Sequence, residues 1–194
     1  MIEYPDKRVQ RSKTALKQTF LQFLQNKSLD QITITEIVKE ANYNRGTFYA
    51  HFDSKEVLLA EIVDDVLKEM VRQIRKPYLS LTTINLEEMN VEEITLFSYF
   101  KENEMLFKTL LSNHIQIDFR HKIAKAIEEL FIAEYEYELE ESHLDLKLLY
   151  IYRSHGIAGI IIRWIEDGFQ ESPEYMSEQI VALMVTSTKV FHIK

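Results

Sequence analysis

Residues 34–58 read ITEIVKEANYNRGTFYAHFDSKEVL and hold two short helical patterns separated by a turn. The first pattern, over residues 34–41, repeats apolar side chains at three- and four-residue spacing, which is typical of one face of a helix. Thr33 and Glu36 have the spacing of a capping box, in which the hydroxyl and the carboxylate each accept a hydrogen bond from a free amide. The sequence therefore predicts a helix of about two turns that begins after Thr33.

A second short helix is predicted directly after the first. Residues 42–44, Asn-Tyr-Asn, predict a tight turn because asparagine tolerates the left-handed backbone conformation and its side chain can cap a following amide. Residues 45–51 then continue as a helix that turns Phe48 inward, with Phe52 also expected in the core. Two short helices joined by a tight turn form the helix-turn-helix arrangement, whose second helix lies in the major groove of DNA.

The rest of the chain is also predicted to be helical. Apolar periodicity indicates a helix over 8–26 and a long one from about 55 to 75, which Pro77 ends. Residues 78–89 indicate a loop or a broken helix. Further helices are predicted over 90–100, 104–112, 115–133, 143–167 (capped by Ser142 and Gly168) and 173–191. Only four glycines and three prolines interrupt 194 residues, so the expected fold is all-α with about nine helices.

One stretch is open to a different interpretation. Residues 134–141, Glu-Tyr-Glu-Tyr-Glu-Leu-Glu-Glu, alternate between polar and apolar side chains, which by period alone is typical of a strand. No partner strand is recognisable elsewhere in the sequence. The stretch is therefore interpreted as a helix end followed by a solvated loop, and no strand is predicted.

Charge is divided unevenly along the chain. Residues 1–55 carry nine Lys and Arg against six Asp and Glu, a net charge of +3, whereas residues 56–194 carry fourteen against twenty-five, a net charge of −11. Binding to phosphate depends on the local potential, so the total of −8 does not exclude DNA as a partner. The first 55 residues are expected to supply the basic surface.

Several other classes of protein are disfavoured. The chain has no cysteine, which excludes disulfides and thiolate sites, and its longest apolar run, residues 156–162, is too short to span a bilayer. Residues 1–8 lack the apolar segment of a signal peptide, so a soluble cytoplasmic protein is expected. No glycine-rich phosphate loop or nucleophile elbow is present, and the pair His114 and Asp118 is too small a set for a metal. We therefore expect no enzyme, cofactor or metal.

Residues 8–68 resemble the TetR/AcrR family of transcriptional regulators. The likeness is carried by the Gly-Thr-Phe-Tyr run at 46–49 and by the Lys-Glu pair at 55–56 before leucine. Asn44 stands where the family usually has serine or threonine, and asparagine caps a helix equally well. Tyr43 stands where a small aliphatic residue is common. The resemblance implies a DNA-binding head at residues 1–55, a linking helix over about 55–76, and a body for dimerisation and effector binding at 77–194.

Ten residues of the head are predicted to contact DNA. Tyr43 and Arg45 are the candidates for base contact because the first residues of the recognition helix penetrate deepest. Gly46 lets the backbone approach phosphates, and Lys55 with its helix dipole is a candidate phosphate clamp. His51 has the alternative role of an ordinary surface histidine, while Arg11 and Lys17 are expected to be solvated. The full set is Thr33, Thr35, Tyr43, Asn44, Arg45, Gly46, Thr47, Tyr49, His51 and Lys55.

The body also carries a resemblance. Residues 152–169 and 172–174 are similar to regulators of dihydroxyacetone kinase genes, and in the wider family the last two helices of each subunit pair across a two-fold axis. This implies a homodimer. Four small residues on the penultimate helix agree with a dimer, because they would let a helix of another subunit approach closely. They are Ser154, Gly156, Ala158 and Gly159. Recognition helices about 34 Å apart fit successive major grooves, so a palindromic operator is expected.

An effector pocket is expected in the body. The candidates are Phe97, Phe100, Phe107, Phe119, Arg120 and Trp164. The alternative is that the aromatic side chains are core residues and that the arginine lies solvated or ion-paired on the surface. The favoured function is a repressor that a small molecule releases from its operator. The alternatives are an activator that acts with a coregulator and a helical interaction module without DNA binding.

Overall fold

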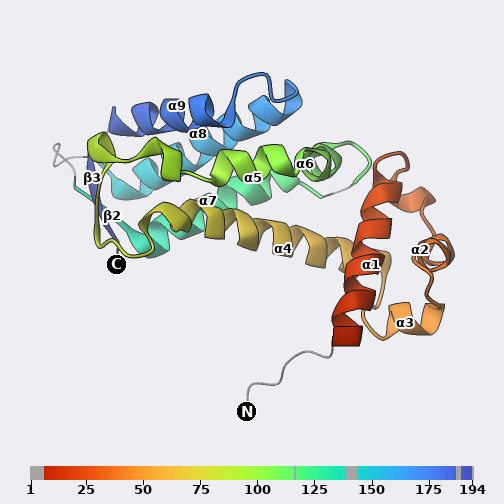
Figure 1. Cartoon of the computed structure of the whole chain (residues 1–194). Helices are drawn as coiled ribbons and strands as arrows, with labels where there is room; N and C mark the ends of the chain where they lie inside the picture. The colour runs from red at the N-terminus through yellow and green to blue at the C-terminus, as the bar shows by residue number, and fades with distance from the viewer. Residues whose placement is uncertain (1–6, 116, 139–143, 187–188, 194) are drawn as a thin grey trace, which may run out of the picture. The chain divides into compact units, whose positions relative to one another are not determined.

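A computed structural model describes residues 7–115, 117–138, 144–186 and 189–193 (Figure 1). The described residues form two compact units: unit 1 lies within residues 1–65 and 109–117, and unit 2 within residues 66–108 and 118–194. Nine α-helices occur in the described part of the chain, so the predicted helical architecture is confirmed. Each helix among these residues is too short or too polar to cross a lipid bilayer.

Unit 1 contains the helix-turn-helix elements. These are α1 (Lys7–Leu24), the 3-10 turn η1 (Leu29–Gln31), α2 (Ile34–Glu40), α3 (Arg45–Tyr49), the first part of α4 (Lys55–Arg75) and the end of α6 (Glu104–Leu111). Their apolar faces meet in a core that includes Leu16, Phe20, Ile37, Phe48 and Phe52, all buried. The predicted core positions of Phe48 and Phe52 are confirmed.

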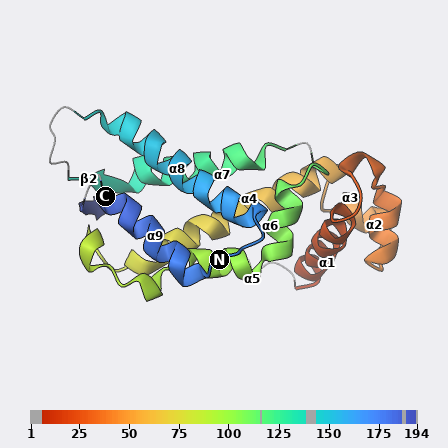
Figure 2. The ribbon, with the colours of Figure 1, turned by 90° about the horizontal axis from the view of Figure 1, so that it is seen from above.

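Unit 2 is built mainly from helices that pack side by side. Its elements are the second part of α4, most of α6, α5 (Leu96–Glu102), α7 (Phe119–Glu134), α8 (Leu146–Glu166) and α9 (Pro173–Val185), with the 3-10 turns η2 (Lys76–Tyr78), η3 (Leu86–Glu88) and η4 (Val91–Glu93). α7 packs along α8, and α9 packs against α5 (Figure 2). Gly168 ends α8 as predicted, with a φ of +84° that favours glycine.

A small antiparallel sheet in unit 2 corrects the prediction that the chain has no strand. β1 (Thr83–Asn85) and β2 (Tyr135–Tyr137) pair on either side of β3 (Val190–Ile193), which places Phe191 opposite both Ile84 and Tyr137. The alternating stretch at 134–141, predicted as a helix end and loop for want of a partner strand, forms β2 over its first residues. Its partner, β3, begins within the predicted last helix, at residues 190 and 191, and continues to Ile193. Residues 139–141 lie outside the described part.

Several helix ends also differ from the predicted ones. α9 ends at Val185 rather than near residue 191. α7 begins at Phe119 rather than residue 115, because the Asp118 carboxylate accepts from the His121 amide at 3.0 Å. His114 therefore does not share a helix with Asp118. Asp145 caps α8, and the predicted cap Ser142 lies outside the described residues.

Candidate nucleic-acid interface

The start of α2 is fixed by the predicted capping box. The Glu36 amide donates to Thr33 Oγ1 at 3.2 Å, and the Thr33 amide donates to Glu36 Oε2 at 2.9 Å. Thr33 Oγ1 itself donates to Glu36 Oε2 at 2.7 Å, so its proton is committed to the cap. Thr35 is exposed, one position into the helix. Of these two predicted phosphate contacts, Thr35 is the better placed.

The turn between α2 and α3 follows from two asparagines. Asn42 has a φ of +60°, the left-handed conformation expected for this position. Asn44 caps α3, because its Oδ1 accepts from the Thr47 amide at 2.9 Å and from the Thr47 hydroxyl at 3.3 Å. These contacts are local in sequence, and they set the direction in which α3 leaves the turn.

The structure shows a reason for glycine at position 46 that the sequence interpretation missed. A Cβ added at this position would lie 3.1 Å from Asn44 Oδ1, the same oxygen that caps α3. A larger side chain would crowd the cap. Glycine therefore leaves the capping side chain in place, whereas a Cβ would require Asn44 Oδ1 to shift by a few tenths of an ångström.

One face of α3 is buried and the opposite face is presented to solvent. Phe48 is fully buried, whereas 47% of Tyr49 and 37% of Tyr43 are exposed. Arg45 lies one turn before Tyr49: its Nη2 donates to the Tyr49 hydroxyl at 3.3 Å, and its guanidinium lies 5.8 Å from the centre of the ring. The phenol and the guanidinium thus form one outward pair on the recognition helix.

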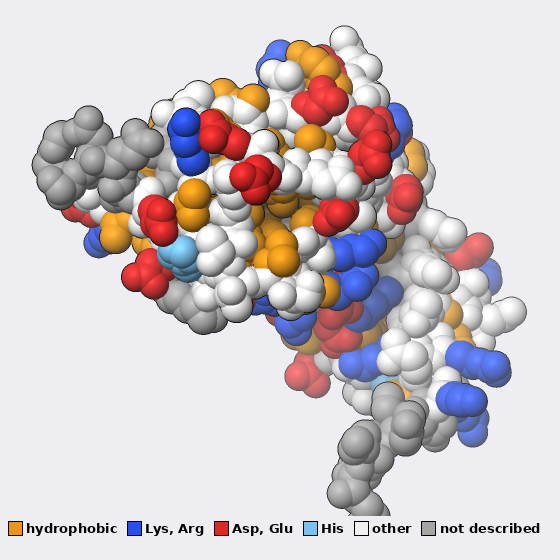
Figure 3. Space-filling view, turned by 60° about the vertical axis from the view of Figure 1, so that its left-hand side comes forward, with side chains coloured by type: hydrophobic (Ala, Val, Ile, Leu, Met, Phe, Trp, Pro, Cys, Tyr) orange, Lys and Arg blue, Asp and Glu red, His pale blue; other side chains and the backbone are white. Residues whose placement is uncertain are grey.

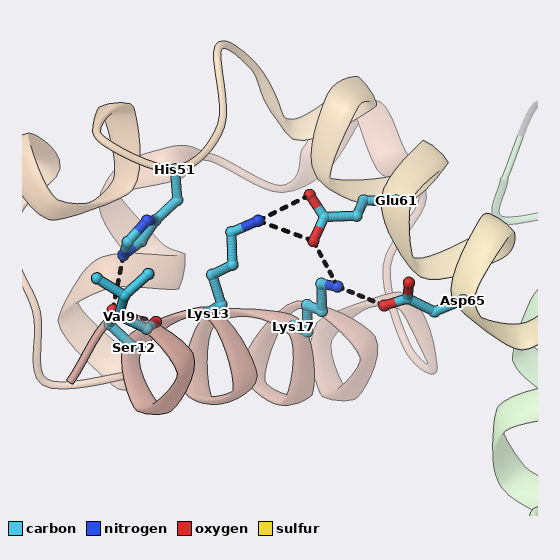
Figure 4. Close-up of polar contacts among 7 residues, drawn as sticks. All are labelled: Val9, Ser12, Lys13, Lys17, His51, Glu61 and Asp65. Atoms are coloured by element: carbon cyan, nitrogen blue, oxygen red, sulfur yellow. Dashed lines mark hydrogen bonds and ion pairs between the residues drawn. The ribbon is translucent and has the colours of Figure 1, made fainter. Parts of the chain in front are cut away.

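His51 is held against α1 rather than left free at the surface (Figure 4). The Ser12 hydroxyl, buried on α1, donates to the Val9 carbonyl at 2.9 Å and lies 2.6 Å from His51 Nε2. The Ser12 hydroxyl and the imidazole can each donate or accept, so this contact is a hydrogen bond in either tautomer of His51. Sequence reasoning missed Ser12. Its signal was a polar residue in the apolar stripe that continues at Leu16 and Phe20.

Two lysines of α1 form ion pairs with α4 (Figure 4). Lys17 Nζ lies 2.7 Å from Glu61 and 2.6 Å from Asp65, and Lys13 lies 3.1 Å from Glu61. Burial raises the pKa of Glu61, but the hydrogen bonds from Lys17 and Lys13 outweigh it and hold that pKa below its ordinary value. Lys17 was expected to be solvated. It instead joins α1 to α4.

Lys55, the predicted phosphate clamp, contacts backbone oxygens of its own chain in this structure. Its ammonium donates to the carbonyl oxygens of Leu29 at 2.7 Å and Ile32 at 2.9 Å, with that of Asp30 at 3.5 Å. An ammonium has three protons, and all three face backbone oxygens around η1. Lys55 therefore fastens the start of α4 to η1.

Several basic side chains remain on the surface of unit 1. Lys7, Arg11, Lys39 and Arg45 are exposed, on α1, α2 and α3. Lys27 does not belong to this group, because its ammonium pairs at 2.8 Å with Glu36, the carboxylate of the capping box. The basic surface available to phosphate is thus narrower than the composition of the first 55 residues suggested.

The residues predicted for an effector pocket are mostly core. Phe97 alone among them lines an apolar cavity of about 80 Å³ in unit 2. The other aromatic side chains are buried against one another: Phe100 lies 4.4 Å from Phe107, and Trp164 lies 5.6 Å from Phe97 between ring centres. Phe119 is also buried, while exposed Arg120 pairs with Glu166. The composition indicated an aromatic interior but did not locate the cavity.

Two family models match the chain. The one described as "Bacterial regulatory proteins, tetR family" matches residues 21–62. The one described as "Transcriptional regulator C-terminal region" matches residues 90–186, which is half of the chain.

Curated relatives are regulators of the same kind. YxbF of Bacillus subtilis, an uncharacterized helix-turn-helix regulator, is 26% identical over 176 residues, or 87% of this chain. The match covers 43% of YxbF, so the chain spans less than half the length of that relative. DhaS of Lactococcus lactis, described as the activator of the dhaKLM operon, is 24% identical over 181 residues, covering 91% of this chain and 90% of DhaS.

Solved structures share the fold. A dihydroxyacetone kinase operon activator, DhaS, superposes with a TM-score of 0.65 at 21% identity, covering 90% of this chain and 94% of the other. A TetR regulator from Streptococcus agalactiae gives 0.63 at 23% identity, covering 92% and 96%. The expected likeness to regulators of dihydroxyacetone kinase genes is confirmed. With half of its length matched by a regulator family model and its helix-turn-helix by another, the chain belongs to the TetR family of DNA-binding transcriptional regulators.

Proposed function

We propose that the chain binds a palindromic operator as a homodimer, with α3 in the major groove, and that a small-molecule effector in unit 2 releases it. The observation that carries the DNA-binding part is the outward pair of Arg45 and Tyr49 on a helix whose rear side chain, Phe48, is fixed in the core. A guanidinium at the front of a recognition helix can donate twice to one guanine.

The ten predicted contact residues divide into two groups. Those proposed to touch DNA directly are Thr35, Tyr43, Arg45, Thr47 and Tyr49. The others are proposed to hold the elements around the turn in position, at the start of α2, at the start of α3, against α1 and between α4 and η1, and they are Thr33, Asn44, Gly46, His51 and Lys55. Because a recognition helix of five residues has little stability of its own, these supports decide whether the outward face is presented at all.

Binding to operators selected from random DNA duplexes tests this interface. Arg45→Ala should relax the base preference at one or two positions of each half-site, by about 1–3 kcal/mol of discrimination. Tyr49→Ala should weaken binding to all sequences alike. Lys122→Ala, on the exposed surface of α7, is the matched control and should behave as wild type. Unchanged affinity and base preference in both head variants would contradict the proposal.

Dimerisation is proposed through an apolar face on α8 and α9. Tyr152 is 74% exposed and Leu148 and Leu183 are more than half exposed. Gly156 and Gly159 are exposed too, and a Cβ added to either meets nothing within 4 Å. A second helix can therefore approach α8 closely along this side.

The other two small residues do not take part in this face. Ser154 and Ala158 are buried against their own chain, so the predicted set of four small residues reduces to the two glycines. Gly156→Glu should convert the dimer to a monomer without loss of helicity, because the position is exposed and an added Cβ meets no other part of the chain within 4 Å. Ala133→Glu, exposed on α7, is the control. Sedimentation velocity that shows a dimer for Gly156→Glu would reject this face.

The sign of regulation is proposed as repression, with activation as the second candidate. The second candidate is favoured by the relative DhaS, which is described as an activator. Transcription in vitro from a promoter that carries the selected operator separates the two. Added protein should lower transcript yield, and a higher yield would assign the chain as an activator.

A further inference from the structure

Residues 77–93, which lie between α4 and α5, form an open hollow in unit 2. The hollow has a volume of about 430 Å³, and all of its lining residues come from this one segment. Cavities of about 150 Å³ hold benzene, so the hollow has room for more than one side chain. The two family models match residues 21–62 and 90–186, so most of the segment lies between the matched ranges. The hollow is therefore built largely from residues that neither family model covers.

Apolar side chains remain exposed around the hollow. Leu81, which lines it, is 49% exposed, and Leu79 is 75% exposed two residues earlier. Pro77 and Met89 line it too and are half-buried. Figure 3 shows the end of unit 2 that carries the sheet, where hydrophobic side chains are exposed among acidic ones. Apolar surface of this kind gains free energy when a partner covers it.

The strand beside the hollow, β1, lies at one end of the sheet, and all three of its residues line the hollow. In an antiparallel pair, the residues that bond to the neighbouring strand alternate with residues that do not. The Ile193 amide donates to Thr82 O at 3.0 Å, and the Leu86 amide donates to Lys189 O at 2.7 Å. Thr83, one position after Thr82, therefore turns its N–H and C=O away from β3.

These outward backbone groups leave one edge of the sheet open. In the described part of the chain, no residue bonds to the N–H or C=O of Thr83, or to the N–H of Asn85, which faces the same way. Thr83 is also exposed. Unpaired backbone groups on an edge strand can pair with an added strand, which would lie about 4.7–4.9 Å from β1.

The hollow carries negative charge that is not balanced nearby. Glu88 and Glu93 line it, both are exposed, and neither has an ion pair among the described residues. The neighbouring Glu87, by contrast, pairs with Lys189 at 3.0 Å. A partner that carries cations beside its apolar side chains would complement this charge. A second copy of the chain would bring further carboxylates to the same edge, and these would repel Glu88 and Glu93.

We propose that the open edge of β1 binds an extended segment of another protein, one that carries lysine or arginine together with aliphatic side chains. The backbone of the segment pairs with Thr83, and its aliphatic side chains cover Leu81 in the hollow. Its cations lie near Glu88 and Glu93. The proposal goes beyond the proposed function, because it adds a protein partner at residues that belong neither to the DNA interface nor to the proposed dimer face.

The test uses the full chain and a fluorescent peptide, acetyl-Lys-Val-Lys-Leu-Lys-Val-Lys-amide, with binding followed by fluorescence anisotropy. The same peptide with glutamate in place of every lysine should bind at least roughly fivefold more weakly, because its charge matches that of the hollow. Two further versions, N-methylated at alternate amides, block the two edges of the peptide in turn. One of them should bind at least roughly fivefold more weakly, because it loses its hydrogen bonds to Thr83.

A charge-reversal variant locates the binding site. Glu88→Lys combined with Glu93→Lys should reverse the preference, so that the glutamate peptide binds more tightly than the lysine peptide. The matched control is Glu102→Lys combined with Glu129→Lys, exposed on α5 and α7, which changes the net charge by the same amount. The control should keep the wild-type preference. Far-ultraviolet circular dichroism of both double variants should equal that of wild type, because all four positions are exposed.

Three outcomes would overturn the inference. A preference that reverses in the control as well would assign the binding to the net charge of the chain. Equal binding of the parent peptide and both N-methylated versions, or no binding of the lysine peptide at millimolar concentration, would show that the edge does not pair. Sedimentation velocity without peptide should show nothing larger than the proposed dimer, and larger assemblies that Leu81→Ser dissolves would show that a second copy occupies the edge.

Discussion

Replacement of Lys55 by methionine distinguishes a structural role from a DNA contact. The substitution removes the ammonium and keeps an apolar stem of similar length. The lost contacts are two short hydrogen bonds, 2.7 Å to Leu29 O and 2.9 Å to Ile32 O. A hydrogen bond from a charged donor contributes about 1.5–3 kcal/mol. Because Lys55 is only half-buried, water replaces part of this, and we expect a loss of about 2–3 kcal/mol in the free energy of unfolding.

That loss corresponds to a fall of about 5–10 °C in melting temperature for a chain of this size. Urea unfolding followed by circular dichroism measures the loss, and a salt titration of operator binding measures the number of phosphate contacts. If Lys55 clamped a phosphate, the salt slope would fall by about 0.9 while stability stayed the same. Lys122→Met, on the exposed surface of α7, is the control for the loss of one charge. Wild-type stability with a reduced salt slope in Lys55→Met would refute the structural role.

Three further outcomes are expected. Hydrogen bonds from Lys27 and Thr33 lower the pKa of Glu36 from 4.5 to about 2. The stability that this carboxylate contributes is therefore present above pH 4.5 and is lost as the pH falls to about 2. The difference in unfolding free energy between wild type and Glu36→Gln should shrink over that window, and a constant difference would contradict this prediction. Asn44→Ala should cost about 1 kcal/mol in urea unfolding by removing the cap of α3, whereas Asn44→Ser should retain most of it; equal losses would argue against a capping role. Phe191→Ala should cost about 3–4 kcal/mol because it empties the centre of the sheet, and a loss under about 1 kcal/mol would show that β3 does not hold the end of unit 2 together.

Local features of unit 1 were predictable because the contacts that make them lie within a few residues. The capping box joins Thr33 to Glu36 and the cap of α3 joins Asn44 to Thr47, each across three positions. The left-handed conformation at Asn42 concerns a single residue. Backbone geometry fixes what such spacings can do, so the residue types alone are informative. The same reasoning gave the inward face of α3.

Contacts between distant segments were not predictable in this way. His51 meets Ser12 across 39 residues, and Lys55 reaches carbonyl oxygens 23 to 26 residues before it. A lysine near DNA-binding elements carries the same charge whether it faces phosphate or backbone oxygen. Only the packed arrangement of α1, η1 and α4 decides between these partners.

The sequence by itself determined the helical class, the helix-turn-helix and the outward face of α3, since helix period and caps are properties of a short stretch. The tertiary structure decided that β2 and β3, more than 50 residues apart, pair as strands, and that Phe97 but not Phe100 borders a cavity. Strand pairing and cavity shape depend on which surfaces meet after the chain has closed long loops. No short window of residues records that outcome.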